Sequence, residues 1–268
     1  MIELLKTKIE QFESKSDKYN ALREELQLLM LNILNENNHF NNIAFLGGTA
    51  LRILYKIRRF SEDLDFSLVD KEKYDFDTIL EDLGRAFTRR NLKYSFKVRK
   101  QVSAVKSVLV KFTNLLYKLK LSPLKDENII IKLDIDENPP LGFITEFTTL
   151  RENAMIGINH FDQPSMFAGK LHAILKREYT KGRDYFDLLW FISSGIKPNI
   201  KFLENALEQS TGQKISLDIQ LIKTMLQEKI KETNFEEVIS DLSPFIMDEW
   251  SLKHYNQETF MGVVERQL

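Results

Sequence analysis

The sequence has no cysteine among its 268 residues, which excludes disulfide bonds and every metal or redox site built on thiolates. Histidine is also scarce, and His39, His160 and His254 do not have the spacing of a metal site. No apolar run approaches the roughly 20 residues that a membrane-spanning helix needs. The segment that follows Met1 lacks the apolar core of a secretory signal. We therefore expect a soluble, cytoplasmic protein.

Acidic residues are absent from Leu83 to Lys125, a segment of 43 residues that holds twelve lysines and arginines. The net charge of −1 for the whole chain conceals this asymmetry. One interpretation is that these lysines do no more than keep an exposed sheet edge from pairing with the edge of another sheet. They could also follow the phosphates of a nucleic acid. We predict RNA binding at the basic residues of an alternating stretch in this segment: Lys93, Lys97, Arg99 and Lys100.

The hydrophobic pattern changes along the chain. Helical spacing covers 19–34 and 77–90, whereas short apolar or alternating runs predict strands at 43–46, 63–69, 92–100, 107–112 and 129–136. After Pro164 the pattern is almost wholly helical, with Ser165 as the predicted N-cap of a first helix. These features predict an α+β protein. A small mixed sheet with flanking helices would occupy residues 1–160, and a helical C-terminal domain would occupy residues 161–268.

A glycine pair, Gly47-Gly48, separates a predicted strand from a predicted helix and is followed by Thr49. Glycines let the backbone approach a phosphate group closely. The first turn of a helix offers unpaired N–H groups to an anion, and a threonine hydroxyl adds one more donor. We therefore predict that these three residues bind a nucleotide phosphate.

Asp63 and Asp65 lie two residues apart on a predicted strand, so both carboxylates project from one face. Two such carboxylates repel each other unless a cation lies between them, and oxygen ligands favour Mg²⁺ or Mn²⁺. A third carboxylate could come from Asp134, with Asp136 as the competing choice on the same face. This set favours nucleotidyl transfer, in which one metal bridges the triphosphate oxygens and a second activates the attacking hydroxyl.

Two segments carry a resemblance to a known family: residues 45–52 (FLGGTALR) and residues 59–66 (RFSEDLDF). They resemble the nucleotidyl transferase AbiEii/AbiGii toxin family, which is placed in the polymerase-β-like nucleotidyltransferase superfamily. The resemblance extends through residues 170–173 (KLHA) and 183–188 (RDYFDL), and it covers roughly residues 40 to 195. Many superfamily members have Gly-Ser where this chain has Gly48-Thr49, but threonine keeps the hydroxyl.

The resemblance implies a role for further residues. Lys170 would contact the nucleotide phosphates, and either Asp184 or Asp187, on one face of a helix, would complete the catalytic set. Arg59 and Ser61 match as well and are assigned to the nucleotide site as supports. Taken without the resemblance, Lys170 could be a solvated lysine, and Asp184 could simply be an acid that favours a helix start.

We therefore expect a toxin that transfers a nucleotide from an NTP to an acceptor and releases pyrophosphate. The resemblance and the basic segment together favour RNA as the acceptor, with the tRNA 3′ end as the specific candidate. The resemblance also implies a cognate antitoxin. Two alternatives stay open: a small-molecule acceptor, as in aminoglycoside nucleotidyltransferases, and a non-catalytic binding relative. The first would not need the basic segment, and the second would not need the carboxylates.

Overall fold

The computed structural model describes residues 1–100, 104–152, 154–246 and 249–268. Its contacts divide the chain into two compact units. The first unit comprises residues 1–55, 60–139 and 146–160, and the second comprises 56–59, 140–145 and 161–268. The two units thus alternate along the chain before residue 161, and the division into two domains at residue 160 stays a prediction.

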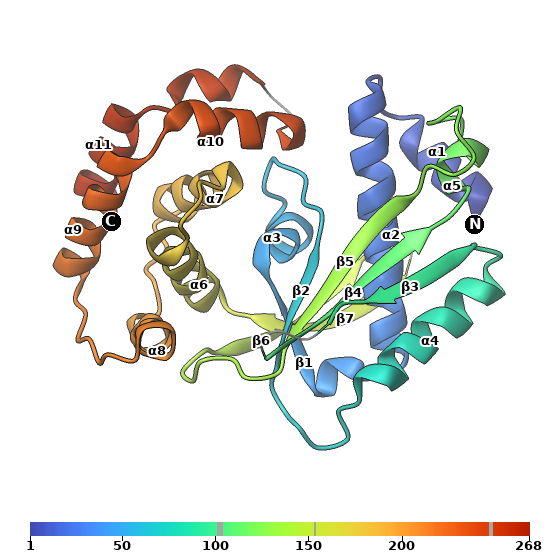
Figure 1. The fold of residues 1–268 in the computed structure, drawn as a ribbon, viewed down its shortest axis with the longest axis horizontal. Coiled ribbons are helices and arrows are strands. Elements are labelled where there is room, and N and C mark those ends of the chain that lie inside the picture. The colour runs from blue at the N-terminus through green and yellow to red at the C-terminus, as the bar shows by residue number, and fades with distance from the viewer. Residues whose placement is uncertain (101–103, 153, 247–248) are drawn as a thin grey trace. The chain divides into compact units, whose positions relative to one another are not determined.

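The described residues form a mixed seven-stranded sheet in the order β3-β4-β5-β2-β1-β7-β6 (Figure 1). Its strands are β1 (Ile43–Leu46), β2 (Leu64–Leu68), β3 (Tyr94–Val98), β4 (Val105–Phe112), β5 (Ile129–Asp136), β6 (Thr145–Arg151) and β7 (Met155–Phe161). The helices of the first unit are α1 (Ile2–Ile9), α2 (Lys15–Glu36), α3 (Gly47–Tyr55), α4 (Phe76–Arg89) and α5 (Leu115–Lys118). The predicted α+β class is confirmed, although strands β6 and β7 were not predicted.

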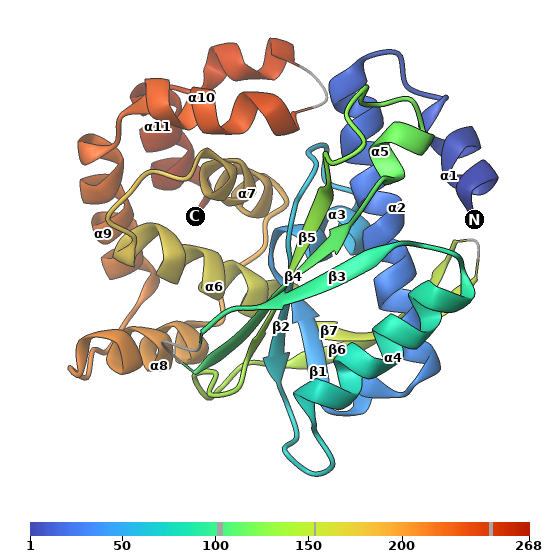
Figure 2. The same cartoon turned by 45° about the vertical axis from the view of Figure 1, so that its right-hand side comes forward.

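The two faces of the sheet differ in character. Along β5 the side chains at 129, 131, 133 and 135 are fully buried, whereas those between them are more exposed. On the buried face, Phe87 of α4 lies 5.3 Å from Tyr94 and 5.0 Å from Phe112, measured between ring centroids. Helix α4 accordingly lies beside β3 in both views (Figure 2). The apolar alternation therefore buries one sheet face and leaves polar side chains on the other.

The second unit is helical. Its helices are α6 (Gln163–Lys176), α7 (Gly182–Ser193), α8 (Ile200–Thr211), α9 (Ile219–Glu232), α10 (Phe235–Leu242) and α11 (Gln257–Gln267). The prediction that Ser165 caps the first of them was wrong. Asp162 is the N-cap, and its carboxylate accepts a hydrogen bond from the Ser165 N–H at 2.8 Å. The helix begins earlier because Pro164 is tolerated in a first turn, where its missing N–H costs no hydrogen bond.

Close helix contacts hold the second unit together. The rings of Phe167 in α6 and Phe191 in α7 stack with centroids 4.7 Å apart. At Gly182 an added Cβ would collide with the main-chain oxygen of Val238, so glycine allows α7 to begin directly against α10. Within the described ranges, no helix combines the length and apolar character needed to cross a bilayer.

Candidate functional site

Gly47 joins β1 to α3 next to the carboxylate of Asp65. Its φ angle of +81° lies in the left-handed region, which favours glycine. A Cβ at this position would also collide with Oδ2 of Asp65. Both observations explain why glycine stands here. They also show that the main chain at the start of α3 lies close to Asp65, one of the predicted metal ligands.

Thr49 and Gln27 brace the segment that leads into β2. The side chain of Thr49 is fully buried, and its hydroxyl donates to the main-chain oxygen of Asp63. From α2, the buried Gln27 amide donates to the main-chain oxygens of Ser61 at 3.1 Å and Glu62 at 2.9 Å. The predicted phosphate donor Thr49 therefore holds the carboxylate segment in place. Sequence reasoning missed Gln27 because nothing in α2 distinguishes it from a surface glutamine.

The parallel pairing of β2 with β5 places Asp65 directly beside Asp134. Register partners project from the same face, and neighbouring strands lie about 4.8 Å apart. Asp63 comes just before β2 and shares the face of Asp65. Asp136 lies two pairs further along, beside Ser67, and accepts a hydrogen bond from the Asn138 N–H at 3.0 Å. Of the two competing candidates, Asp134 is therefore the neighbour of Asp65.

Lys132 projects from the same face of β5, and its ammonium forms an ion pair with Oδ2 of Asp134. Burial alone would lower the pKa of Lys132. The carboxylates of Asp134, Asp63 and Asp65 outweigh burial and raise that pKa above its ordinary value. A cationic side chain therefore already lies among the predicted metal ligands. Sequence reasoning overlooked it, although its position two residues before Asp134 was a usable signal.

Two buried polar atoms near these carboxylates lack partners. Oδ1 of Asp134 and Oγ of Ser107 have no hydrogen-bond partner among the described residues, and Ser107 is the register partner of Asp134 in β4. Oxygen donors of this kind fit Mg²⁺ or Mn²⁺. Across the same ranges, no three histidine or acidic side chains are gathered closely enough to hold a metal ion. The oxygen donors of these side chains suit a divalent cation, and Lys132 lies among them as the ion-pair partner of Asp134.

Three of the predicted RNA-binding residues, Lys93, Lys97 and Arg99, alternate onto this same sheet face. Lys97 pairs with Leu109, which in turn pairs with Lys132. The N–H of Arg99 donates to the main-chain oxygen of Ser107 at 2.8 Å, so Arg99, Ser107, Asp134 and Asp65 follow one another across the sheet. Lys93, Lys97, Arg99 and Lys100 are all exposed. The structure thus brings Lys93, Lys97 and Arg99 onto one surface with the predicted acidic residues, because directly opposed residues of paired strands share a face.

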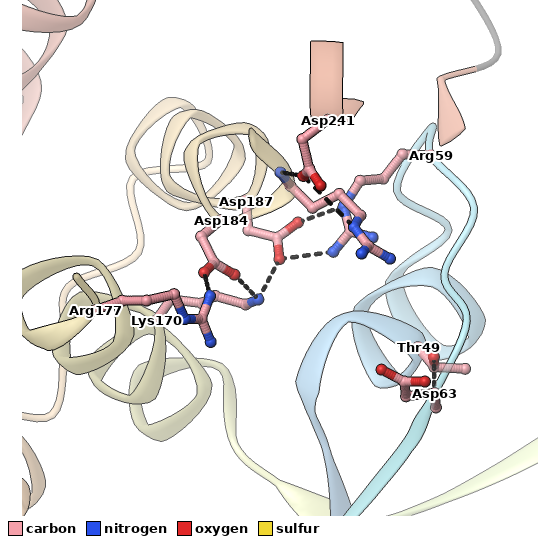
Figure 3. Close-up of polar contacts among 9 residues, drawn as sticks. Thr49, Arg59, Asp63, Lys170, Arg177, Asp184, Asp187 and Asp241 are labelled. Atoms are coloured by element: carbon pink, nitrogen blue, oxygen red, sulfur yellow. Dashed lines mark hydrogen bonds and ion pairs between the residues drawn. The ribbon is translucent and has the colours of Figure 1, made fainter. Parts of the chain in front are cut away.

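The second unit contains a separate network of buried ion pairs (Figure 3). The guanidinium of Arg59 donates to both oxygens of Asp187, each at 2.7 Å, and both side chains are almost completely buried. Lys170 extends from α6 to α7, where its Nζ lies 2.7 Å from Oδ1 of Asp184 and 2.8 Å from Oδ2 of Asp187. Arg177 forms a further ion pair with Asp184.

Burial would raise the pKa of Asp184, but Lys170 and Arg177 outweigh it and hold that pKa below its ordinary value. Asp184 also lines a pocket of about 170 Å³, together with Arg177 and Lys181. Arg59, by contrast, has almost no exposed surface to offer a nucleotide. The structure therefore brings Arg59, Lys170, Asp184 and Asp187 together but gives them different access to solvent.

Comparison with known proteins identifies the family. Residues 28–263 match the profile of the family described as nucleotidyl transferase AbiEii toxin, type IV TA system, which confirms the resemblance inferred from the motifs. No curated protein matches the sequence significantly. Two solved structures from Helicobacter pylori are similar in fold. JHP933 has a TM-score of 0.53 and 18% identity, covering 92% of this chain and 90% of its own. A protein described as a candidate nucleotidyltransferase has a TM-score of 0.53 and 19% identity, covering 91% and 92%.

Proposed function

This chain belongs to the nucleotidyl transferase AbiEii toxin family of type IV toxin–antitoxin systems, and we propose that it transfers a nucleotide from an NTP to the 3′ end of an RNA. Membership of the family implies an NTP substrate and a cognate antitoxin. Within this proposal, tRNA is the acceptor and a divalent metal is required.

The row that runs from Asp65 through Asp134 and Ser107 to Arg99 carries the proposal. Arg99 is two strands away from Asp134, which is about 10 Å at ordinary strand spacing. Lys97 and Lys93 continue the positive charge along β3. A single-stranded 3′ end could therefore place its terminal ribose near Asp134 while its preceding phosphates contact the basic strand.

The chemistry follows from the residues of this face. The 3′-hydroxyl oxygen of the acceptor attacks the α-phosphorus, and its proton passes to Oδ1 of Asp134. The bond from the α-phosphorus to the bridging oxygen breaks, and pyrophosphate leaves. The main-chain N–H groups at Gly47 and Gly48 hold a phosphate oxygen at the start of α3. A divalent cation held by Asp63, Asp65 and Asp134 would supply Lewis-acid stabilisation of the phosphate charge.

For the second unit we propose two different roles. Arg59 and Asp187 form a structural anchor, because their bidentate pair is buried on all sides. Lys170 and Asp184 are the functional pair, because the anchor fixes Lys170 through Asp187 and because Asp184 borders a pocket. This proposal assigns Asp184, and not Asp187, to the functional set.

The test is the transfer of label from each of the four α-³²P-labelled NTPs to total cellular RNA, with Mg²⁺ or Mn²⁺ present. We expect a discrete labelled tRNA band that is absent with the Asp63→Ala, Asp65→Ala variant. Lys97→Glu, Arg99→Glu should lose RNA labelling but keep NTP binding. The matched control is Lys118→Glu, Lys120→Glu, which changes the same charge in the same basic segment at exposed positions beyond β4.

RNA binding should also weaken with salt, with a log–log slope of about −0.7 for each phosphate contacted. The double reversal at Lys97 and Arg99 should reduce that slope more than the control does. Equal labelling by both charge-reversed variants would show that the basic strand β3 does not bind the acceptor. If label enters only small molecules, and if this labelling requires Asp63 and Asp65, the acceptor is a small molecule and not RNA.

A further inference from the structure

Lys132 stands among the three carboxylates that the proposed function assigns to metal binding. It lies two residues before Asp134 on β5 and projects from the same face. The pairing of Leu64 with Leu133 places Lys132 level with Asp63, which comes just before β2. Its ammonium is half-buried and forms an ion pair with one oxygen of Asp134. A positive charge that belongs to the chain itself therefore already occupies the face where a cation is expected.

The charges on this face explain why such a lysine is present. Carboxylates held close together on one surface repel each other, and a nearby cation relieves the repulsion. Lys132 supplies this cation from within the chain. The pairing is incomplete, because Oδ1 of Asp134 is buried and has no hydrogen-bond partner in the described part of the chain. Asp134 thus uses one oxygen for Lys132 and keeps the other for a ligand.

An ammonium and a divalent cation cannot share Asp134 without repulsion, because both are positive and the site is partly shielded from water. Metal binding would require the side chain of Lys132 to leave Asp134, and its long flexible stem allows such a movement.

We propose that Lys132 is a resident counter-ion of the carboxylate face, one that the divalent cation displaces from Asp134 on binding. Lys132 thereby stabilises the metal-free protein and weakens its affinity for metal. The inference rests on the proposed metal dependence but is independent of the nature of the acceptor. Lys132 is a positioning residue in this scheme, because it acts through Asp134.

The experiment is isothermal titration of Mn²⁺ into the full-length protein without NTP. Lys132→Met keeps the length of the side chain but removes its charge, so it should bind Mn²⁺ at least about tenfold more tightly than the wild type. Lys132→Arg keeps the charge and should bind within about twofold of the wild type. The matched control is Lys111→Met. Lys111 shares the face but pairs with Ile130, away from the carboxylates, so its removal should leave the affinity unchanged.

Thermal unfolding supplies a second readout that needs no catalysis. Without metal, Lys132→Met removes the ammonium that pairs with Asp134 and should lower Tm, whereas saturating Mn²⁺ should raise Tm more than it does in the wild type. If Lys132→Met does not fold without metal, Lys132→Gln, which can still donate a hydrogen bond to Asp134, gives the same comparison. Equal or weaker Mn²⁺ binding by both neutral variants would overturn the inference alone. No binding by any protein, including the wild type, would overturn the proposed metal dependence with it.

Discussion

Aspartates gather in both units of this protein, but their surroundings differ. On the sheet face, Asp63, Asp65 and Asp134 are partly exposed, and Lys132 pairs with only one oxygen of Asp134. In the helical unit, Asp184 and Asp187 are almost completely buried and are matched by Lys170, Arg59 and Arg177. In the first group, Oδ1 of Asp134 has no hydrogen-bond partner among the described residues, whereas the second group is closely matched by its partners.

The difference follows from burial. A fully buried carboxylate is stable only when opposite charges and hydrogen bonds replace its water, so burial commits it to partners in the chain. A carboxylate at a half-exposed sheet face can keep water and exchange it for a cation. The same residue type can therefore serve a ligand in one unit and the fold in the other. Four substitutions test this contrast, from the largest expected effect to the smallest.

The strongest test separates activity from stability on the sheet face. Asp65→Asn should reduce nucleotide transfer by about 10³-fold, because it removes charge that would hold a cation at the developing transition state. Its free energy of unfolding should fall little or rise, because the substitution also relieves repulsion between carboxylates. Urea unfolding and initial rates of label transfer measure the two effects. A large loss of stability would show that the sheet carboxylates are structural, like those of the helical unit.

The opposite pattern is expected for the buried pair in the helical unit. Arg59→Met removes both hydrogen bonds that the buried Asp187 carboxylate accepts from the guanidinium and leaves Lys170 as its ion-pair partner, so it should cost about 3–5 kcal/mol of stability. The matched control is Arg58→Met, at the adjacent exposed position, which should cost less than about 0.5 kcal/mol. Urea unfolding measures both variants. If Arg59→Met is as stable as the wild type, the anchor role proposed for Arg59 and Asp187 is wrong.

Gly47 lies directly against the Asp65 side chain of the carboxylate face, and Gly195 offers a matched control. Both have a left-handed φ angle, +81° and +70°, but an added Cβ would meet nothing within 4 Å at Gly195. Alanine at either position should cost about 1–2 kcal/mol for the backbone conformation. Only Gly47→Ala should also slow transfer, by less than Asp65→Asn does, because its methyl group displaces the Asp65 carboxylate without removing its charge. Unimpaired transfer by Gly47→Ala would contradict the close approach described for this turn.

The smallest expected effect depends on pH. The pKa of Asp184 is held low in the folded protein, so the unfolded chain binds a proton first as the pH falls. The ion pairs of Asp184 therefore contribute fully well above its unfolded pKa of about 3.9, and the contribution is lost as the pH falls through the folded value. Urea unfolding from pH 7 to pH 3 should show a steeper loss for the wild type than for Asp184→Asn. Parallel curves would show that Lys170 and Arg177 do not stabilise the charged form.

Much of the sheet could be predicted because its strands alternate strongly. The prediction for β5 matched its bounds, since isoleucine and leucine occupy each inward position from Ile129 to Ile135. Strands β6 and β7 were missed, because their exposed apolar residues, such as Phe147 and Met155, obscure the alternation. Ser165 was mistaken for a cap because a serine before an apolar run looks the same whether the helix starts at it or before it.

The candidate site divides in a similar way. The motifs identified Gly47, Asp63 and Asp65 through their order along the chain. Gln27 and Lys132 were not found, because their importance depends on what other strands and helices place beside them. The choice between Asp134 and Asp136, and the assignment of Thr49 to bracing the main chain, also needed the register of the paired strands and the packing of α3.

The sequence by itself determined the family, the alternating strands, the glycine turn and the presence of a basic segment, because each is a pattern of neighbours along the chain. Only the tertiary structure decided that the basic strand β3 and the carboxylates of β2 and β5 share one sheet face. It also decided that Arg59, 128 residues before Asp187, is that residue's buried partner. The physical reason is that strand pairing and burial join residues that are distant in sequence, and charge acts through space and not along the chain.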